Sequence, residues 1–109
     1  MATDVDTDTF EKEVLQSEVP VLVDFWGPQC APCLALMPHV EQLGVTHGGQ
    51  LKISKVDASK NRRLCLNLKV LSLPTFLFYK NGQEVDRLTG QALRFEEIEA
   101  SAKKIIDES

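Results

Sequence analysis

Two cysteines separated by two residues are the part of this chain best suited to chemistry. Cys30 and Cys33 lie within residues 26–33, WGPQCAPC. A pair at this spacing can close a small disulfide ring with little movement, so it can cycle between dithiol and disulfide without remodelling the fold. The spacing therefore predicts thiol–disulfide exchange.

The position of the pair, after a predicted strand and at the head of a predicted helix, assigns a role to each cysteine. Cys30 would face unpaired backbone N–H groups and the positive end of the helix dipole, which favour its thiolate and make it the nucleophile. Cys33 lies one turn further in, so we expect it to be more buried and to act as the resolving thiol. Between them, Ala31 and Pro32 stiffen the first turn, where the missing proline N–H costs nothing.

Residues 19–26, VPVLVDFW, are apolar nearly throughout, so we expect a central strand that is covered on both faces and buries Asp24. Asp24 lies nine residues before Cys33. Burying a carboxylate is costly, so we expect a use for it as the proton acceptor for the resolving thiol. The alternative is a structural carboxylate that is hydrogen-bonded inside the core.

A zinc site is the alternative interpretation of the cysteine pair, and it needs four ligands. The further candidates are Cys65, His39 and His47, which lack any second C-x-x-C or H-x-x-x-H spacing. We therefore expect no metal. The two histidines are interpreted as surface or packing residues, and Cys65 as a small buried hydrophobe, with a regulatory or glutathionylated thiol and a dimer contact as its alternatives.

Length and charge narrow the function classes. The 109 residues suit one domain, 1–109, with one site. A net charge of -4, with acids and bases interspersed, offers no basic stripe for nucleic acid or for an anionic membrane surface. The N-terminus lacks the regions of a secretory signal, and no apolar run approaches the roughly 18 residues of a spanning helix, so we expect a cytoplasmic protein. We also expect a monomer.

Hydrophobic periodicity predicts alternating elements. We expect helices over 10–17, 30–47, 61–68 and 95–107, and strands over 19–26 and 51–57. The first helix would begin with a capping box of Asp8 and Glu11, Pro38 would kink the second, and residues 48–49 (GG) would end it. Asn81-Gly82 between residues 75–80 and 83–89 predicts a β-hairpin with a type I′ turn. The class is α/β, with a mixed sheet covered by helices.

The motifs together carry a family resemblance. With the strand 21–26 (VLVDFW), the cysteine pair, residues 73–75 (LPT), the Asn81-Gly82 hairpin and Gly90 in order, the chain resembles the thioredoxin family over nearly its whole length. The resemblance implies a central mixed five-stranded sheet flanked by four helices, and an enzyme that reduces protein disulfides. It also implies a Cys30–Cys33 redox-active disulfide with no bound cofactor, client proteins with disulfides, and a thioredoxin reductase.

The resemblance also implies further site residues. Pro74 would follow a cis peptide bond, and Leu73, Pro74 and Gly90 would help form a groove that holds an extended substrate segment. Leu73 has an alternative interpretation as a core residue. Lys55 matches a lysine near the buried aspartate, where it would oppose the rise in the pKa of Asp24, and its alternative is a solvated strand lysine. The residues expected to contact substrate beside the cysteines are Trp26, Gln29, Ala31 and Pro32.

The chain departs from the common family pattern around one surface. Common thioredoxins read WCGPCK where this chain reads QCAPCL, so Gln29 removes an aromatic and Leu34 removes a cation. Residues 71–73 (LSL) replace a more usual basic residue, glycine and isoleucine. We hypothesise a divergent thioredoxin with a dedicated, non-standard reductase or a narrow client set.

Two other functions compete with disulfide reduction. One is a binding or assembly module on the same fold, in which the cysteines are not required. The other is an oxidase or isomerase, which is disfavoured because those roles favour an oxidising compartment and the chain shows no export signal.

Overall fold

The computed structural model describes residues 2–108, so the two ends of the expected domain, Met1 and Ser109, lie outside the described residues. Strands and helices alternate along the chain, and a hairpin and a final helix close it. The elements are β1 (Ala2–Asp4), η1 (Glu11–Leu15), β2 (Val21–Trp26), α1 (Ala31–Thr46), β3 (Lys52–Asp57), η2 (Ala58–Lys60), α2 (Arg62–Asn67), β4 (Thr75–Lys80), β5 (Gln83–Thr89) and α3 (Phe95–Asp107).

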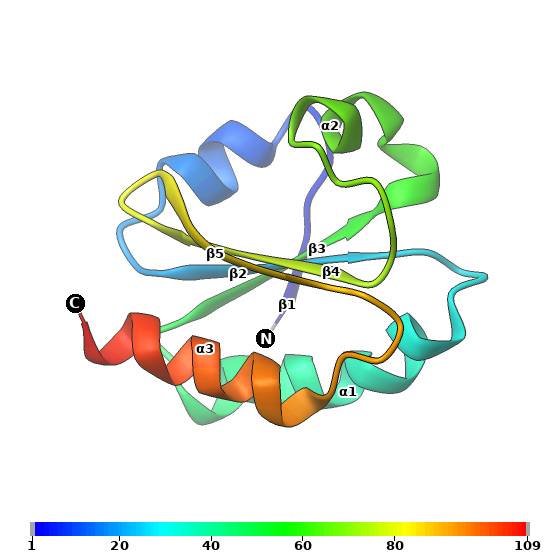
Figure 1. Cartoon of the computed structure of the whole chain (residues 1–109). Coiled ribbons are helices and arrows are strands. Elements are labelled where there is room, and N and C mark those ends of the chain that lie inside the picture. Colours follow the sequence, from blue (N-terminus) through cyan, green and yellow to red (C-terminus); the bar gives the residue numbers. More distant parts are fainter. Residues whose placement is uncertain (1, 109) are drawn as a thin grey trace.

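The strands form one mixed five-stranded sheet in the order β1-β3-β2-β4-β5. β1, β3 and β2 run parallel, whereas β4 is antiparallel to both β2 and β5. Four helices cover the sheet, with η1 and α2 on one face and α1 and α3 on the other, and the short 3-10 turn η2 leads into α2 (Figure 1). The α/β class with a mixed five-stranded sheet is therefore confirmed.

The sheet separates two hydrophobic cores. Phe10, Val14, Phe25, Leu64 and Tyr79 belong to the core on the η1 and α2 side. Leu22, Val40, Ile53, Phe76 and Ile98 belong to the core on the α1 and α3 side. Successive residues of a strand point to opposite faces, so these two lists also show which face each strand residue takes.

The central strand β2 confirms the expectation of burial on both faces. Every residue from Val21 to Phe25 is buried, Asp24 included. β2 lies between β3 and β4 and is covered by helices on both sides, which is why its sequence is apolar nearly throughout. The strand begins at Val21, two residues after the expected start.

The β4–β5 hairpin follows the prediction to the residue. Asn81 and Gly82 both have positive φ, 54° and 78°, as a type I′ turn requires. A Cβ at Gly82 would also lie 2.8 Å from the backbone oxygen of Leu15, so the turn packs closely against the end of η1. Gly82 is thus needed both for its backbone conformation and for its lack of a side chain.

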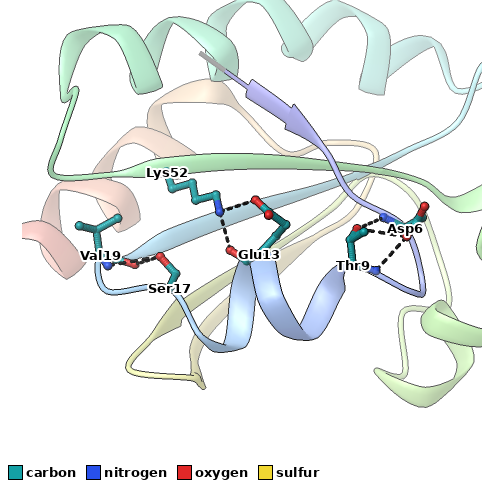
Figure 2. Close-up of polar contacts among 6 residues, drawn as sticks. All are labelled: Asp6, Thr9, Glu13, Ser17, Val19 and Lys52. Atoms are coloured by element: carbon teal, nitrogen blue, oxygen red, sulfur yellow. Dashed lines mark hydrogen bonds and ion pairs between the residues drawn. The ribbon is translucent and has the colours of Figure 1, made fainter.

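The predicted capping box at the first helix is wrong. Asp6 and Thr9 form the reciprocal pair instead: the backbone N–H of Thr9 donates to Asp6 Oδ1 at 2.9 Å, and the N–H of Asp6 donates to Thr9 Oγ1 at 3.0 Å (Figure 2). The turn begins two residues earlier than Asp8, because Thr7 is held by the side chain of Asn61, whose Oδ1 accepts from the Thr7 N–H at 2.9 Å.

One ion pair attaches the first helix to the sheet. Lys52 Nζ, on β3, donates to Glu13 Oε1 at 2.7 Å and to the backbone oxygen of Glu13 at 2.8 Å (Figure 2).

Among the helices of residues 2–108, none is long and apolar enough to cross a membrane.

Candidate active site

The two cysteines of the C-x-x-C motif are joined in a disulfide at the start of α1. The Sγ atoms lie 2.11 Å apart and the Cα atoms 5.2 Å apart. β2 ends at Trp26, a short loop follows, and α1 begins at Ala31 directly after Cys30. The strand and the helix therefore place the pair at the carboxyl end of β2, as the sequence predicts.

Cys30 takes the N-cap position of α1. It has an extended backbone conformation, and the backbone N–H of Cys33 donates to Cys30 Sγ at 3.2 Å. Pro32 lies in the first turn, where it leaves no hydrogen bond unmade. A helix N-terminus with an N–H aimed at sulfur favours negative charge on that sulfur, which is the environment that activates a thiol.

The two cysteines differ sharply in exposure. Cys30 is half-buried and opens onto solvent, whereas the side chain of Cys33 is fully buried at 0% exposure. Only Cys30 can therefore be reached by a bulky disulfide without movement of the helix. The buried sulfur of Cys33 takes part in exchange only through its disulfide bond to Cys30.

Asp24 lies on the face of the sheet that α1 covers. Leu22, two residues earlier, packs in the core on the α1 and α3 side, and strand alternation places Asp24 on that same face. Its side chain is buried, and no group of the described residues donates a hydrogen bond to either carboxyl oxygen. Burial raises the pKa of Asp24 from 3.8 to about 7, an effect that the positive charge of Lys55 partly offsets.

Lys55 is the cross-strand neighbour of Asp24 in the parallel β2–β3 register. Its ammonium group nevertheless pairs elsewhere: Lys55 Nζ lies 2.8 Å from Glu41 Oε2 and 3.8 Å from Asp4 Oδ1. The hydrogen bond to Glu41 is the main cause that raises the pKa of Lys55. Lys55 is thus neither a free solvated lysine nor a direct partner of Asp24.

Glu41 is a residue of this cluster that the sequence reasoning missed. It lies on α1, two turns after Cys33, and its negative charge raises the pKa of Asp24 further. A signal was available: Glu41 is the charged residue between buried Val40 and Leu43, on a helix face that must meet the sheet.

A hollow of about 970 Å³ opens beside Cys30, and we call it the active-site hollow. Four of the residues expected to contact substrate line it: Gln29, Ala31, Pro32 and Leu73. Ala58, Ser59, Arg62 and Gln91 line it as well and were not expected. They come from the η2–α2 segment and the loop after β5, which only the folded topology brings to Cys30.

The remaining predicted contact residues lie around the active-site hollow and not on its wall. Pro74 is buried, and the peptide bond between Leu73 and Pro74 is cis, as the family resemblance implied. The backbone N–H of Gly90 donates to the oxygen of Pro74 at 3.1 Å, so the two are neighbours. Trp26 lines a different hollow, with Lys55 and Asp57.

The other candidate residues lie apart from the cysteine pair. Cys65 is a free thiol that packs in the core on the η1 and α2 side, and burial raises its pKa. His39 is exposed, and its ring lies 5.5 Å from that of Phe95. Within residues 2–108, no group of three or more His, Cys, Asp or Glu side chains is placed to hold a metal ion.

Comparison with known proteins agrees with this geometry. The family model named Thioredoxin matches residues 2–104. A thioredoxin of Acetoanaerobium sticklandii is 48% identical over 103 residues, covering 94% of this chain and 98% of the relative. A thioredoxin of Peptoclostridium acidaminophilum is 40% identical, covering 95% and 94%, and thioredoxin 1 of a Nostoc strain is 40% identical, covering 82% and 83%.

Proposed function

The chain belongs to the thioredoxin family and is a thiol–disulfide oxidoreductase, and from that premise we propose how its residues divide the reduction of protein disulfides. The thiolate of Cys30 attacks one sulfur of a client disulfide, forms a mixed disulfide and releases one client thiolate. Cys33 then gives up its proton and attacks Cys30 Sγ. This closes the Cys30–Cys33 disulfide and releases the second client thiolate, so two electrons pass to the client.

One observation carries this division: a half-buried N-cap cysteine is joined to a fully buried one. The N–H of Cys33 that donates to Cys30 Sγ supports Cys30 as the thiol that ionises and attacks. The burial of Cys33 supports the resolving role, because a buried thiol keeps its proton until a base accepts it.

Asp24 is the proposed acceptor of that proton. Its pKa of about 7 lets the carboxyl exchange a proton near neutral pH, where a carboxyl of ordinary pKa would be almost entirely ionised. Lys55 keeps this pKa from rising further. Glu41 acts as a positioning residue, because its 2.8 Å bond holds the ammonium of Lys55 beside α1.

The substrate segment is proposed to lie in the active-site hollow, over Gln29, Ala31 and Pro32 on one side and Leu73 on the other. Pro74 and Gly90 would support the side of the active-site hollow that Leu73 forms, and Trp26, at the end of β2, would support the hollow from the sheet. A backbone that lies extended against residues 73–74 could make strand-like hydrogen bonds there.

The test is the reduction of insulin disulfides with dithiothreitol as the electron source. Wild-type protein should accelerate the reaction, and both Cys30→Ser and Cys30→Ser/Cys33→Ser should reduce the rate to that of dithiothreitol alone. Cys65→Ser, which removes the third cysteine, is the matched control and should retain activity. Full activity in the double variant would overturn the proposal and favour a module in which the cysteines are not required.

Partner choice is the finer part of the proposal. Family membership implies disulfide-containing clients and a thioredoxin reductase. Leu34 and Leu71, two of the positions where this chain departs from the common pattern, are exposed at 44% and 82%. We propose that this altered surface selects a dedicated reductase or a narrow client set. Turnover by a standard NADPH-linked thioredoxin reductase should be poor, and turnover equal to that of an ordinary thioredoxin would contradict this.

The proposal also covers the cellular compartment and the oligomeric state. A dithiol that reduces clients must itself be kept reduced, which suits the cytoplasm. The chain is proposed to act there as a monomer, in one domain over residues 1–109, with the Cys30–Cys33 disulfide as its redox group and no bound cofactor.

A further inference from the structure

A second hollow adjoins the active-site hollow, and we call it the α2 hollow. Its volume is about 320 Å³, and Cys65, Leu66, Val70 and Leu71 are among its lining residues. Ala58, Arg62 and Leu73 line both hollows, so the two share part of their walls. The surface available to a bound client therefore extends from Cys30 across Leu73 to α2.

The α2 hollow is apolar at its rim. Leu66 and Leu71 are exposed at 66% and 82%, among the most exposed large hydrophobic side chains of the described residues. Large apolar side chains left open beside a reactive group are typical of a binding surface, because their burial by a partner is favourable.

Arg62 stands where the two hollows meet. Among residues 2–108, it is the one charged side chain that lines either hollow. None of the described carboxylates lies within ion-pair distance of Arg62, whereas Arg87 and Arg94 each pair with a glutamate. The side chain is exposed, so its guanidinium is free to bind a carboxylate from outside, with two parallel N–H donors.

We propose that the α2 hollow and Arg62 select clients by the sequence beside the target cysteine. The client segment runs from Cys30 across Leu73 onto α2, an acidic side chain of that segment pairs with Arg62, and an apolar side chain enters the α2 hollow between Leu66 and Leu71. This inference rests on the proposed function, because it adds a selectivity to the same exchange reaction.

The charge distribution of the protein favours selectivity for an acidic client segment at Arg62. The chain as a whole carries a net charge of -4, so an acidic partner is repelled by most of the surface. The unpaired guanidinium of Arg62, which lines the same hollow as Cys30, attracts an acidic side chain at this one place. Because the pair would be solvent-exposed, the selectivity is modest, about a threefold to fivefold gain in kcat/KM.

The experiment uses disulfide-bonded peptides with one glutamate and one leucine within three residues of the cysteine, on one side or the other. One set of matched peptides carries glutamine in place of glutamate, and a second set carries alanine in place of leucine. Wild-type protein should reduce the glutamate peptide about threefold to fivefold faster than its glutamine match, on one side of the cysteine only. Raising the ionic strength to about 0.5 M should remove most of this preference.

Arg62→Gln should abolish the preference for glutamate, so that the ratio of the rates for the glutamate and glutamine peptides falls to about one. The matched control is Arg63→Gln, which makes the same charge change at the next residue, an exposed position that lines neither hollow. Leu66→Ser should reduce the gain from the client leucine by about threefold. Equal effects of Arg62→Gln and Arg63→Gln, or a preference that survives Arg62→Gln, would overturn the inference.

Reduction of hydroxyethyl disulfide separates this inference from the proposed function. That small neutral disulfide offers neither a carboxylate for Arg62 nor an apolar side chain for the α2 hollow, so its reduction by the wild type tests the exchange reaction without the client selectivity. Failure of the wild type with hydroxyethyl disulfide would contradict the proposed function itself. Success with it but no discrimination between the peptides would contradict the client selectivity alone.

Discussion

Replacing Asp24 by asparagine removes a carboxyl group whose pKa burial raises well above its ordinary value. The pKa of Asp24 is raised from 3.8 to about 7, so the folded protein retains a proton that the unfolded chain releases near pH 4. Because the native pKa is raised, this proton stabilises the fold fully below the unfolded pKa, and its contribution is lost as the pH rises through the native pKa near 7.

The magnitude follows from the pKa difference. Each pKa unit corresponds to about 1.4 kcal/mol, and pH 5 lies about two units below the native pKa, so the wild type should lose about 3 kcal/mol of unfolding free energy between pH 5 and pH 9 through this group. Asp24→Asn has no proton to lose at this position. Its stability advantage over the wild type should therefore grow by about 3 kcal/mol over the same interval.

The assay is guanidinium unfolding of the disulfide forms of both proteins at pH 5 and pH 9. All other titrating groups are shared, so they cancel when the two proteins are compared at each pH. Asp107→Asn, which makes the same charge change at an exposed position at the end of α3, is the matched control. An equal advantage of Asp24→Asn at both pH values would refute the account of a buried, protonated Asp24.

Three further predictions concern the residues around this group and the hairpin turn. Lys55→Met should raise the pKa of the buried carboxyl above about 7, because it removes the cation that lowers it, and a carboxyl NMR titration unchanged from that of the wild type would contradict this. Glu41→Gln should lower the same pKa, since the negative charge of Glu41 raises it, and an unchanged titration would exclude Glu41 from the cluster. Gly82→Ala should destabilise the fold by about 1–2 kcal/mol more than Gly49→Ala in chemical denaturation, because both glycines have positive φ but only at Gly82 would a Cβ meet backbone at 2.8 Å. Equal losses in the two variants would mean that the hairpin turn relaxes away from η1.

Local signals in the sequence predicted the elements well. The hairpin over residues 75–89 and the helix Phe95–Asp107 agree to the residue, since an Asn-Gly turn and a strong helical periodicity are properties of a few neighbouring residues. The burial of Asp24 was also predictable, because it lies within a strand that is apolar nearly throughout.

Features that depend on contacts between distant segments were not predictable in the same way. Asp6 and Asp8 can each begin a capping pair. The pair that forms begins at Asp6, next to Thr7, whose backbone N–H donates to the side chain of Asn61 more than fifty residues away. Lys55 was expected beside Asp24, but its ammonium group bonds to Glu41, which the sequence reasoning did not consider. Arg62 lines the same hollow as Cys30 only because the fold brings the η2–α2 segment to that hollow.

The central claim is that Cys30 attacks and Cys33 resolves, and mixed-disulfide trapping tests it most directly. Reduced Cys33→Ser and reduced Cys30→Ser are each incubated with an insulin disulfide, and the products are mapped by mass spectrometry after proteolysis. Cys33→Ser should form a stable mixed disulfide between Cys30 and insulin, and Cys30→Ser should form almost none. Equal trapping through Cys33 in Cys30→Ser would contradict the claim.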